Sequence, residues 1–96
     1  MITAEQARQN VYQKEIEDYK KTEIKVYDLL DELNETIILY SKNGFSTVTI
    51  TPYTDENFPT IQRKEIASRI FVKVLEANGY TVDTNNWQDN ILKIHW

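Results

Sequence analysis

Four carboxylates form the densest group of chemically capable side chains in the chain. They lie three and four residues apart, so a helix would present all of them on one face. The four are Asp28, Asp31, Glu32 and Glu35. A carboxylate-bridged pair of metal ions would also need histidines at helical spacing, as in Glu-x-x-His, and the chain has no such pair. We therefore expect no metal site, and predict a solvated face or a docking face for a partner's basic patch.

An acidic face of this kind attracts cations. The second predicted helix carries four side chains that can supply them, within one chain or between chains: Arg63, Lys64, Arg69 and Lys73.

The remaining residues do not form a catalytic set. His95 is the single histidine and is expected to be an exposed strand residue, and no serine stands in a Gly-x-Ser-x-Gly elbow. The chain has no cysteine, which excludes thiolate nucleophiles, thiolate zinc sites and disulfides. Its two glycines are too few for a phosphate-binding loop. We expect a non-enzymatic protein without a cofactor.

Two features leave small-ligand or partner binding open. Arg69 and Lys73 lie one turn apart, which suits a small anion such as a nucleotide, although basic residues at this spacing usually just solvate a helix. Four aromatic residues are expected to be exposed and are candidate stacking residues: Tyr12, Tyr19, Tyr53 and Trp87. Trp87 lies in a polar loop, where it is either an exposed anchor for a partner or a lid over the edge of the core.

Composition predicts one ordered domain. The chain has 96 residues, of which 41% are hydrophobic, so residues 1–96 are expected to form a single domain. A net charge of −4 argues against nucleic-acid binding, which requires clustered basic residues. No apolar run is long enough to span a membrane, and the first residues lack the pattern of a signal peptide. We expect a cytoplasmic location.

A single long helix dominates the predicted structure. Residues 3–43 read as one helix of about 60 Å, whereas a compact domain of this size has a radius of gyration of only about 12 to 13 Å. A heptad pattern runs along the helix from Tyr12. We therefore predict that residues 3–22 project and pair with another copy, with a dimer favoured on base rates. The predicted interface residues are Tyr12, Ile16, Tyr19 and Val26. Apolar spacing is poorest at residues 20–23, so the sequence leaves open whether the helix is straight there.

The pair Asn43-Gly44 admits two interpretations. It is a strong hairpin signal between apolar runs, and it also suits a helix that ends in a Schellman cap. We favour the cap because Asn78-Gly79-Tyr80 repeats the pattern of Asn43-Gly44-Phe45 after a second helical segment.

The rest of the chain predicts strands and one further helix. Residues 45–51 form a strand and residues 53–60 a polar loop. A helix over residues 60–78 buries Ile66, Ile70, Val74 and Ala77. Residues 80–84 and 91–96 then form a hairpin. The predicted fold class is α+β, with helix, strand, helix, strand, strand order and both helices on one face of a three-stranded antiparallel sheet.

Several short segments resemble a recurrent group of small tailed-phage proteins. They are Ile2-Thr3-Ala4-x-x-Ala7-Arg8, the Asn43-Gly44 strand start with Val48-Thr49-Ile50, Gly79-Tyr80-x-Val82 and Ile94-His95-Trp96. The resemblance implies a phage or prophage origin and an α+β fold, and it brings no activity and no site residues with it.

These observations predict a protein that works by binding. The leading hypothesis is a phage accessory protein that self-associates and binds a host protein, for example as an inhibitor of a host factor or defence, in the host cytoplasm. The alternatives are a structural component of the virion and an oligomeric sponge for an anionic nucleotide.

Overall fold

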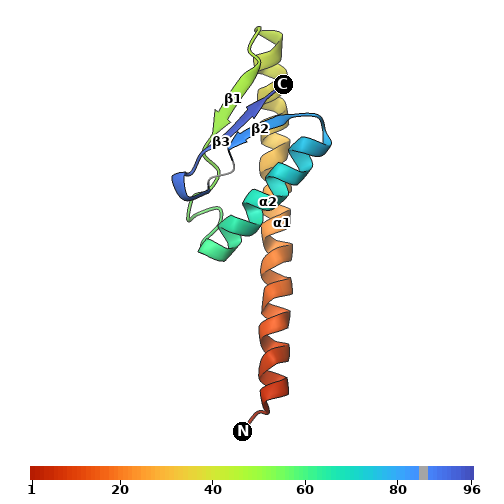
Figure 1. Cartoon of the computed structure of the whole chain (residues 1–96), viewed down its shortest axis with the longest axis vertical. Helices are drawn as coiled ribbons and strands as arrows, with labels where there is room; N and C mark the ends of the chain where they lie inside the picture. Colours follow the sequence, from red (N-terminus) through yellow and green to blue (C-terminus); the bar gives the residue numbers. More distant parts are fainter. Residues whose placement is uncertain (85–86) are drawn as a thin grey trace.

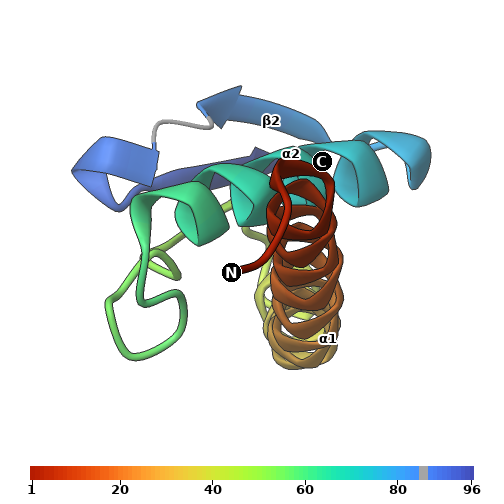
Figure 2. The ribbon, with the colours of Figure 1, turned by 90° about the horizontal axis from the view of Figure 1, so that it is seen from below.

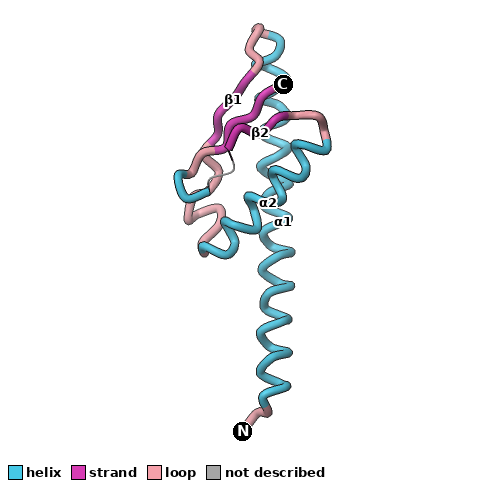
Figure 3. The backbone as a smooth tube through the Cα atoms, viewed as in Figure 1, coloured by secondary structure: helices cyan, strands magenta, loops and turns pink. Residues whose placement is uncertain are grey.

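A computed structural model describes residues 1–84 and 87–96 of the chain, with the side chains of Thr84 and Trp87 outside the description. Helix α1 (Ala4–Lys42) is followed by strand β1 (Thr47–Ile50), helix α2 (Ile61–Ala77) and strand β2 (Thr81–Thr84). A 3₁₀ turn η1 (Trp87–Asp89) leads into strand β3 (Leu92–His95). Figures 1 and 3 show this arrangement. The predicted α+β class and element order are confirmed.

The start of α1 is fixed by a capping box. The Thr3 hydroxyl oxygen accepts a hydrogen bond from the Gln6 backbone N–H at 3.1 Å, and the Thr3 N–H donates to Gln6 Oε1 at 3.0 Å. Two of the N–H groups that a helix leaves without partners are satisfied in this way.

Both helices end in the predicted Schellman cap. At the end of α1, the Phe45 N–H donates to the Tyr40 carbonyl at 3.0 Å and the Gly44 N–H donates to the Ser41 carbonyl at 3.1 Å. At the end of α2, the Tyr80 N–H donates to the Leu75 carbonyl at 3.1 Å. The hairpin alternative at Asn43-Gly44 is therefore wrong.

We expect alanine at Gly44 or at Gly79 to cost about 1 kcal/mol of unfolding free energy each, because both glycines have φ of +87°. A Cβ at either position meets nothing within 4 Å, so the cost comes from the backbone alone. Urea denaturation of each variant measures it. Asparagine tolerates the left-handed conformation better, so Gly79→Asn should cost less than Gly79→Ala; equal losses would argue against a backbone origin.

The three strands form one antiparallel sheet in the order β1-β3-β2. Val48 pairs with Ile94, and Ile94 pairs with Val82 on the other side. The central strand β3 supplies Leu92 and Ile94, which are completely buried. Both helices lie on the same side of the sheet (Figure 2), as predicted from the alternation of apolar and polar residues.

The buried face of α2 differs from the predicted one. Ile70 is buried as predicted, together with Ala67, Phe71 and Leu75. Ile66 and Val74 are only half-buried, and Ala77 is exposed. The helix contacts both α1 and β2, so its buried stripe is centred between two neighbours. The prediction considered a single packing face.

The loop between β1 and α2 contributes to the core instead of forming a purely polar connection. Tyr53 is 3% exposed and Phe58 is fully buried. The Tyr53 N–H donates to Asn90 Oδ1 at 2.6 Å, and the Phe58 N–H donates to the Thr54 carbonyl at 2.8 Å. The loop is thereby folded onto the sheet, and the prediction that Tyr53 is an exposed stacking residue is wrong.

Burial raises the pKa of Tyr53 from 10.0 to about 12, with the Ser68 hydroxyl acting weakly in the opposite sense. The folded chain therefore keeps a proton that the unfolded chain loses from pH 10 upward, so this contribution to stability is complete below pH 10 and disappears through about pH 12. We expect a loss of about 1 to 3 kcal/mol over that range. Urea denaturation at a series of pH values measures it.

Tyr53→Phe should remove that part of the pH dependence, and Tyr40→Phe, at an exposed tyrosine, should leave it unchanged. The same slope in all three proteins would contradict the assignment to Tyr53.

Candidate functional site

The first half of α1 extends beyond the rest of the fold. The molecule measures 63 × 23 × 19 Å and has a radius of gyration of 16.3 Å, compared with about 12 to 13 Å for a compact chain of this length. Figure 1 shows the first turns of α1 extending beyond the level of α2, with no other element beside them. The helix is one continuous element through residues 20–23 and has no sharp bend there.

The projecting half carries an apolar stripe that stays exposed in the described part of the chain. Tyr12 is 65% exposed, Ile16 38% and Tyr19 47%. The three residues repeat at spacings of four and three, so they share one face of the helix. They are the residues that the heptad pattern singled out as an interface.

Val26 was predicted to belong to the same interface, but it is fully buried within the single chain. It packs in the core with residues of the second half of α1 and of α2. The prediction for Val26 is corrected accordingly, because α2 already covers the heptad face at this level of α1.

Thr22 marks the boundary between the two halves of α1. Its side chain is fully buried, and its hydroxyl donates to the Asp18 carbonyl at 2.7 Å. The same oxygen accepts a hydrogen bond from Nε of Arg63 in α2 at 3.0 Å. These two bonds satisfy the buried hydroxyl. They fix the position of α2 on α1 at Thr22, about one helical turn after Tyr19.

Ion pairs stabilise the projecting helix along a different face from the apolar stripe. Lys14 Nζ lies 3.1 Å from Asp18, and Lys21 Nζ lies 3.0 Å from Glu17. The hydrogen bond and charge of Lys21, together with Lys14, lower the pKa of Glu17. Exposed ion pairs at this spacing add only a small stabilisation to a helix, and salt screens it.

The acidic cluster lies on the exposed side of the second half of α1. Asp28, Asp31, Glu32 and Glu35 are all exposed. Within the described part of the chain, no group of histidines and acids is arranged to hold a metal ion, and these four acids take part in none of the ion pairs.

Three of the four basic residues of α2 have other partners in the described chain. Arg63 donates to Thr22, Lys64 forms an ion pair with Asp55, and Arg69 lies 2.6 Å from Glu65. Neutralisation of the acidic cluster by α2 thus does not occur within one chain. Neutralisation by another chain stays a prediction.

Arg69 and Lys73 line a groove of about 200 Å³ that the sequence did not predict. Its other lining residues are Tyr19, Ile66 and Ile70. The groove therefore has an apolar floor, two basic side chains and one residue of the projecting stripe, brought together where α2 crosses α1.

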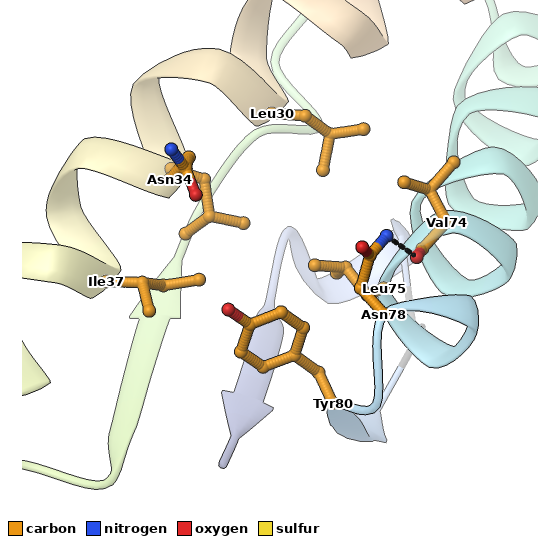
Figure 4. A pocket seen from close by; sticks show the side chains of 8 residues that line it. Leu30, Asn34, Ile37, Val74, Leu75, Asn78 and Tyr80 are labelled. Carbon is orange, nitrogen blue, oxygen red and sulfur yellow. Dashed lines mark hydrogen bonds between the residues drawn. The ribbon is translucent and has the colours of Figure 1, made fainter.

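A second groove of about 210 Å³ lies between the helices, nearer to their C-terminal ends. Figure 4 shows Asn34, Asn78 and Tyr80 around its opening. Asn78 Nδ2 donates to the Val74 carbonyl at 2.8 Å. The rest of its lining is aliphatic: Leu30, Leu33, Ile37, Val74 and Leu75.

The polar face of the sheet holds His95. Its Nε2 lies 3.8 Å from Asp83 Oδ2, and its side chain is 36% exposed. The side chain of Trp87, a predicted partner-binding residue, lies outside the described residues.

No helix in the described ranges has the length and apolar character needed to cross a membrane. Comparison of the chain with protein-family models, curated proteins and solved structures gives no match.

Proposed function

We propose that this protein acts by binding other proteins, as a self-associating, non-enzymatic accessory protein of a phage or prophage, with a host protein as its target. The observation that carries the proposal is the exposed stripe of Tyr12, Ile16 and Tyr19 on a helix that extends past its own core. Helices in proteins gain most of their stability from packing of an amphipathic face, and large exposed apolar residues grouped on one face are typical of interaction surfaces. A second protein surface would satisfy both features.

The acidic cluster supports a second contact, with the foreign partner. Its four carboxylates are exposed and take part in no ion pair in the described chain. It lies on the second half of α1, so a basic partner can approach while the projecting half is occupied by another copy. The phage origin rests on the resemblance of the sequence segments given above.

Two measurements test this function. Sedimentation equilibrium of the full chain at micromolar concentrations should show an oligomer. Affinity capture from a lysate of the bacterial host should retain one protein in a fixed molar ratio, and a variant with Asp28, Asp31, Glu32 and Glu35 changed to the matching amides should lose it.

Recovery of only capsid or tail proteins, or detection of the chain by mass spectrometry in purified particles, would instead support the virion alternative. A monomer that captures nothing would contradict the proposal.

A second candidate function has one specific observation in its favour. Arg69, Lys73 and Tyr19 line the same groove, which suits an anionic nucleotide whose base stacks on the tyrosine. Its weakness is that Arg69 already pairs with Glu65.

A thermal-shift screen with a panel of nucleotides tests the second candidate, since a ligand raises the melting temperature in proportion to the logarithm of its concentration over its Kd. The shift should disappear in Arg69→Gln/Lys73→Gln. A flat response across the panel would remove this candidate.

A further inference from the structure

The exposed face of the projecting helix would match the same face of a second copy that runs in the opposite direction. Arg8, Tyr12, Ile16, Tyr19 and Glu23 lie within an arc of about 80° on the helix. Arg8 and Glu23 are equally distant from the midpoint between residues 15 and 16, and so are Tyr12 and Tyr19. Along the chain this face thus carries a basic residue, two tyrosines and an acidic residue, placed symmetrically about that midpoint.

Arg8 and Glu23, the charged ends of this pattern, have no ion-pair partner among residues 1–84 and 87–96. Glu23 is nevertheless half-buried, and a carboxylate withdrawn from water is stabilised by a nearby cation.

We propose that two copies of the chain pair antiparallel about this midpoint, an arrangement that rests on the self-association proposed above. Arg8 contacts Glu23 of the partner subunit, and Tyr12 packs against the partner's Tyr19. A two-fold axis repeats both contacts, because the same patch serves both subunits in an isologous dimer. The shared segment, residues 8–23, is about 24 Å long.

A parallel pair is disfavoured by the same residues. It would set Arg8 against the partner's Arg8 and Glu23 against the partner's Glu23, which places like charges together. It would also bring the two α2 helices to the same level, beside Thr22. In the antiparallel pair the two folded ends lie at opposite ends of the helix pair.

The antiparallel arrangement also provides an occupant for the groove beside Tyr19. The first turns of the partner's α1 extend past the shared segment to the level of Val26, where α2 covers the heptad face of α1. Glu5 belongs to those first turns. At that level the partner's Glu5 faces the exposed Arg69 and Lys73 of α2, which line the groove.

Charge exchange tests the orientation. Arg8→Glu and Glu23→Arg should each raise the dimer Kd by about tenfold, because two ion pairs become two repulsive pairs. The double variant Arg8→Glu/Glu23→Arg should restore the Kd to within about threefold of the original, since only an antiparallel pair exchanges both signs together. Lys14→Glu, on the other side of the same helix, is the matched control and should leave the Kd nearly unchanged.

Crosslinking supplies an independent readout, because the chain has no cysteine of its own. Tyr12→Cys and Tyr19→Cys chains, mixed in equal amounts with a short thiol crosslinker, should form the mixed product in preference to either homodimer.

Homodimeric products, or a double variant no better than the single ones, would overturn the antiparallel register while leaving self-association intact. A wild-type chain that stays monomeric would instead overturn the proposed function itself.

Discussion

Replacing Phe58 with alanine is expected to lower the free energy of unfolding by about 3 to 5 kcal/mol. The side chain is fully buried, and its ring centroid lies 6.4 Å from that of Tyr53. Tyr53 in turn makes an edge contact with Phe71 of α2, at 6.0 Å. Phe58 thus connects the loop before α2 to the centre of the core, and its removal leaves a cavity that the backbone of the loop can close only in part. Domains of this size are stable by about 5 to 15 kcal/mol, so much of the stability would be lost.

Urea denaturation at one fixed protein concentration measures this loss, because self-association makes apparent stability depend on concentration. Phe45→Ala is the matched control. Phe45 is 59% exposed and its ring centroid lies 5.6 Å from that of the exposed Tyr40, so its loss should cost about 1 kcal/mol or less. If Phe58→Ala fails to fold, Phe58→Leu should still show a loss of about 1 to 2 kcal/mol. Equal effects at positions 45 and 58 would mean that the loop does not belong to the core.

The features that the sequence predicted well are those set by neighbouring residues. The capping box at Thr3 needs only Gln6 three residues later. The two Schellman caps need a glycine that accepts positive φ and an aromatic residue after it, and both copies have this form. Periodicities of two and of 3.6 residues then gave the order of strands and helices and the side of the sheet on which the helices lie.

The failures concern contacts between distant parts of the chain. Tyr53 and Phe58 lie among polar residues, and their burial depends on Asn90, 37 positions after Tyr53. The buried stripe of α2 shifted toward Phe71 because that helix meets α1 and β2 together. No local pattern contains either fact.

The candidate site also combines features that the local sequence predicts with features that depend on contacts between distant residues. The heptad pattern predicted the stripe at Tyr12, Ile16 and Tyr19, and it extended the same stripe to Val26 with equal justification. Only the position of α2, held at Thr22 by Arg63, decides that Val26 is core and Tyr19 is surface. The same crossing adds an apolar groove and Tyr19 to Arg69 and Lys73, which the sequence predicted only as a pair of basic residues one turn apart.

Alanine at Tyr12, Ile16 and Tyr19 together should weaken self-association by about 10³-fold or more. Each truncation removes apolar surface worth about 1 kcal/mol from the interface, the loss occurs in both subunits, and about 1.4 kcal/mol corresponds to tenfold in Kd. Alanine has the highest helix propensity, so the projecting helix itself should persist. Sedimentation equilibrium measures the association, and circular dichroism shows whether the helix content is kept.

The control for this variant is Ile24→Ala/Ile38→Ala, which removes two apolar side chains that are 65% and 46% exposed on the second half of α1. These residues lie outside the shared segment or off its face, so the control should self-associate like the wild type. If the control dissociates and the triple variant does not, the interface lies on the second half of α1 and the projecting helix must meet something other than its own copy. In that case the projecting half of α1 is available to a foreign protein. If only the triple variant dissociates, the projecting half is occupied by the second copy, and the acidic side of α1 is the surface left for a foreign partner.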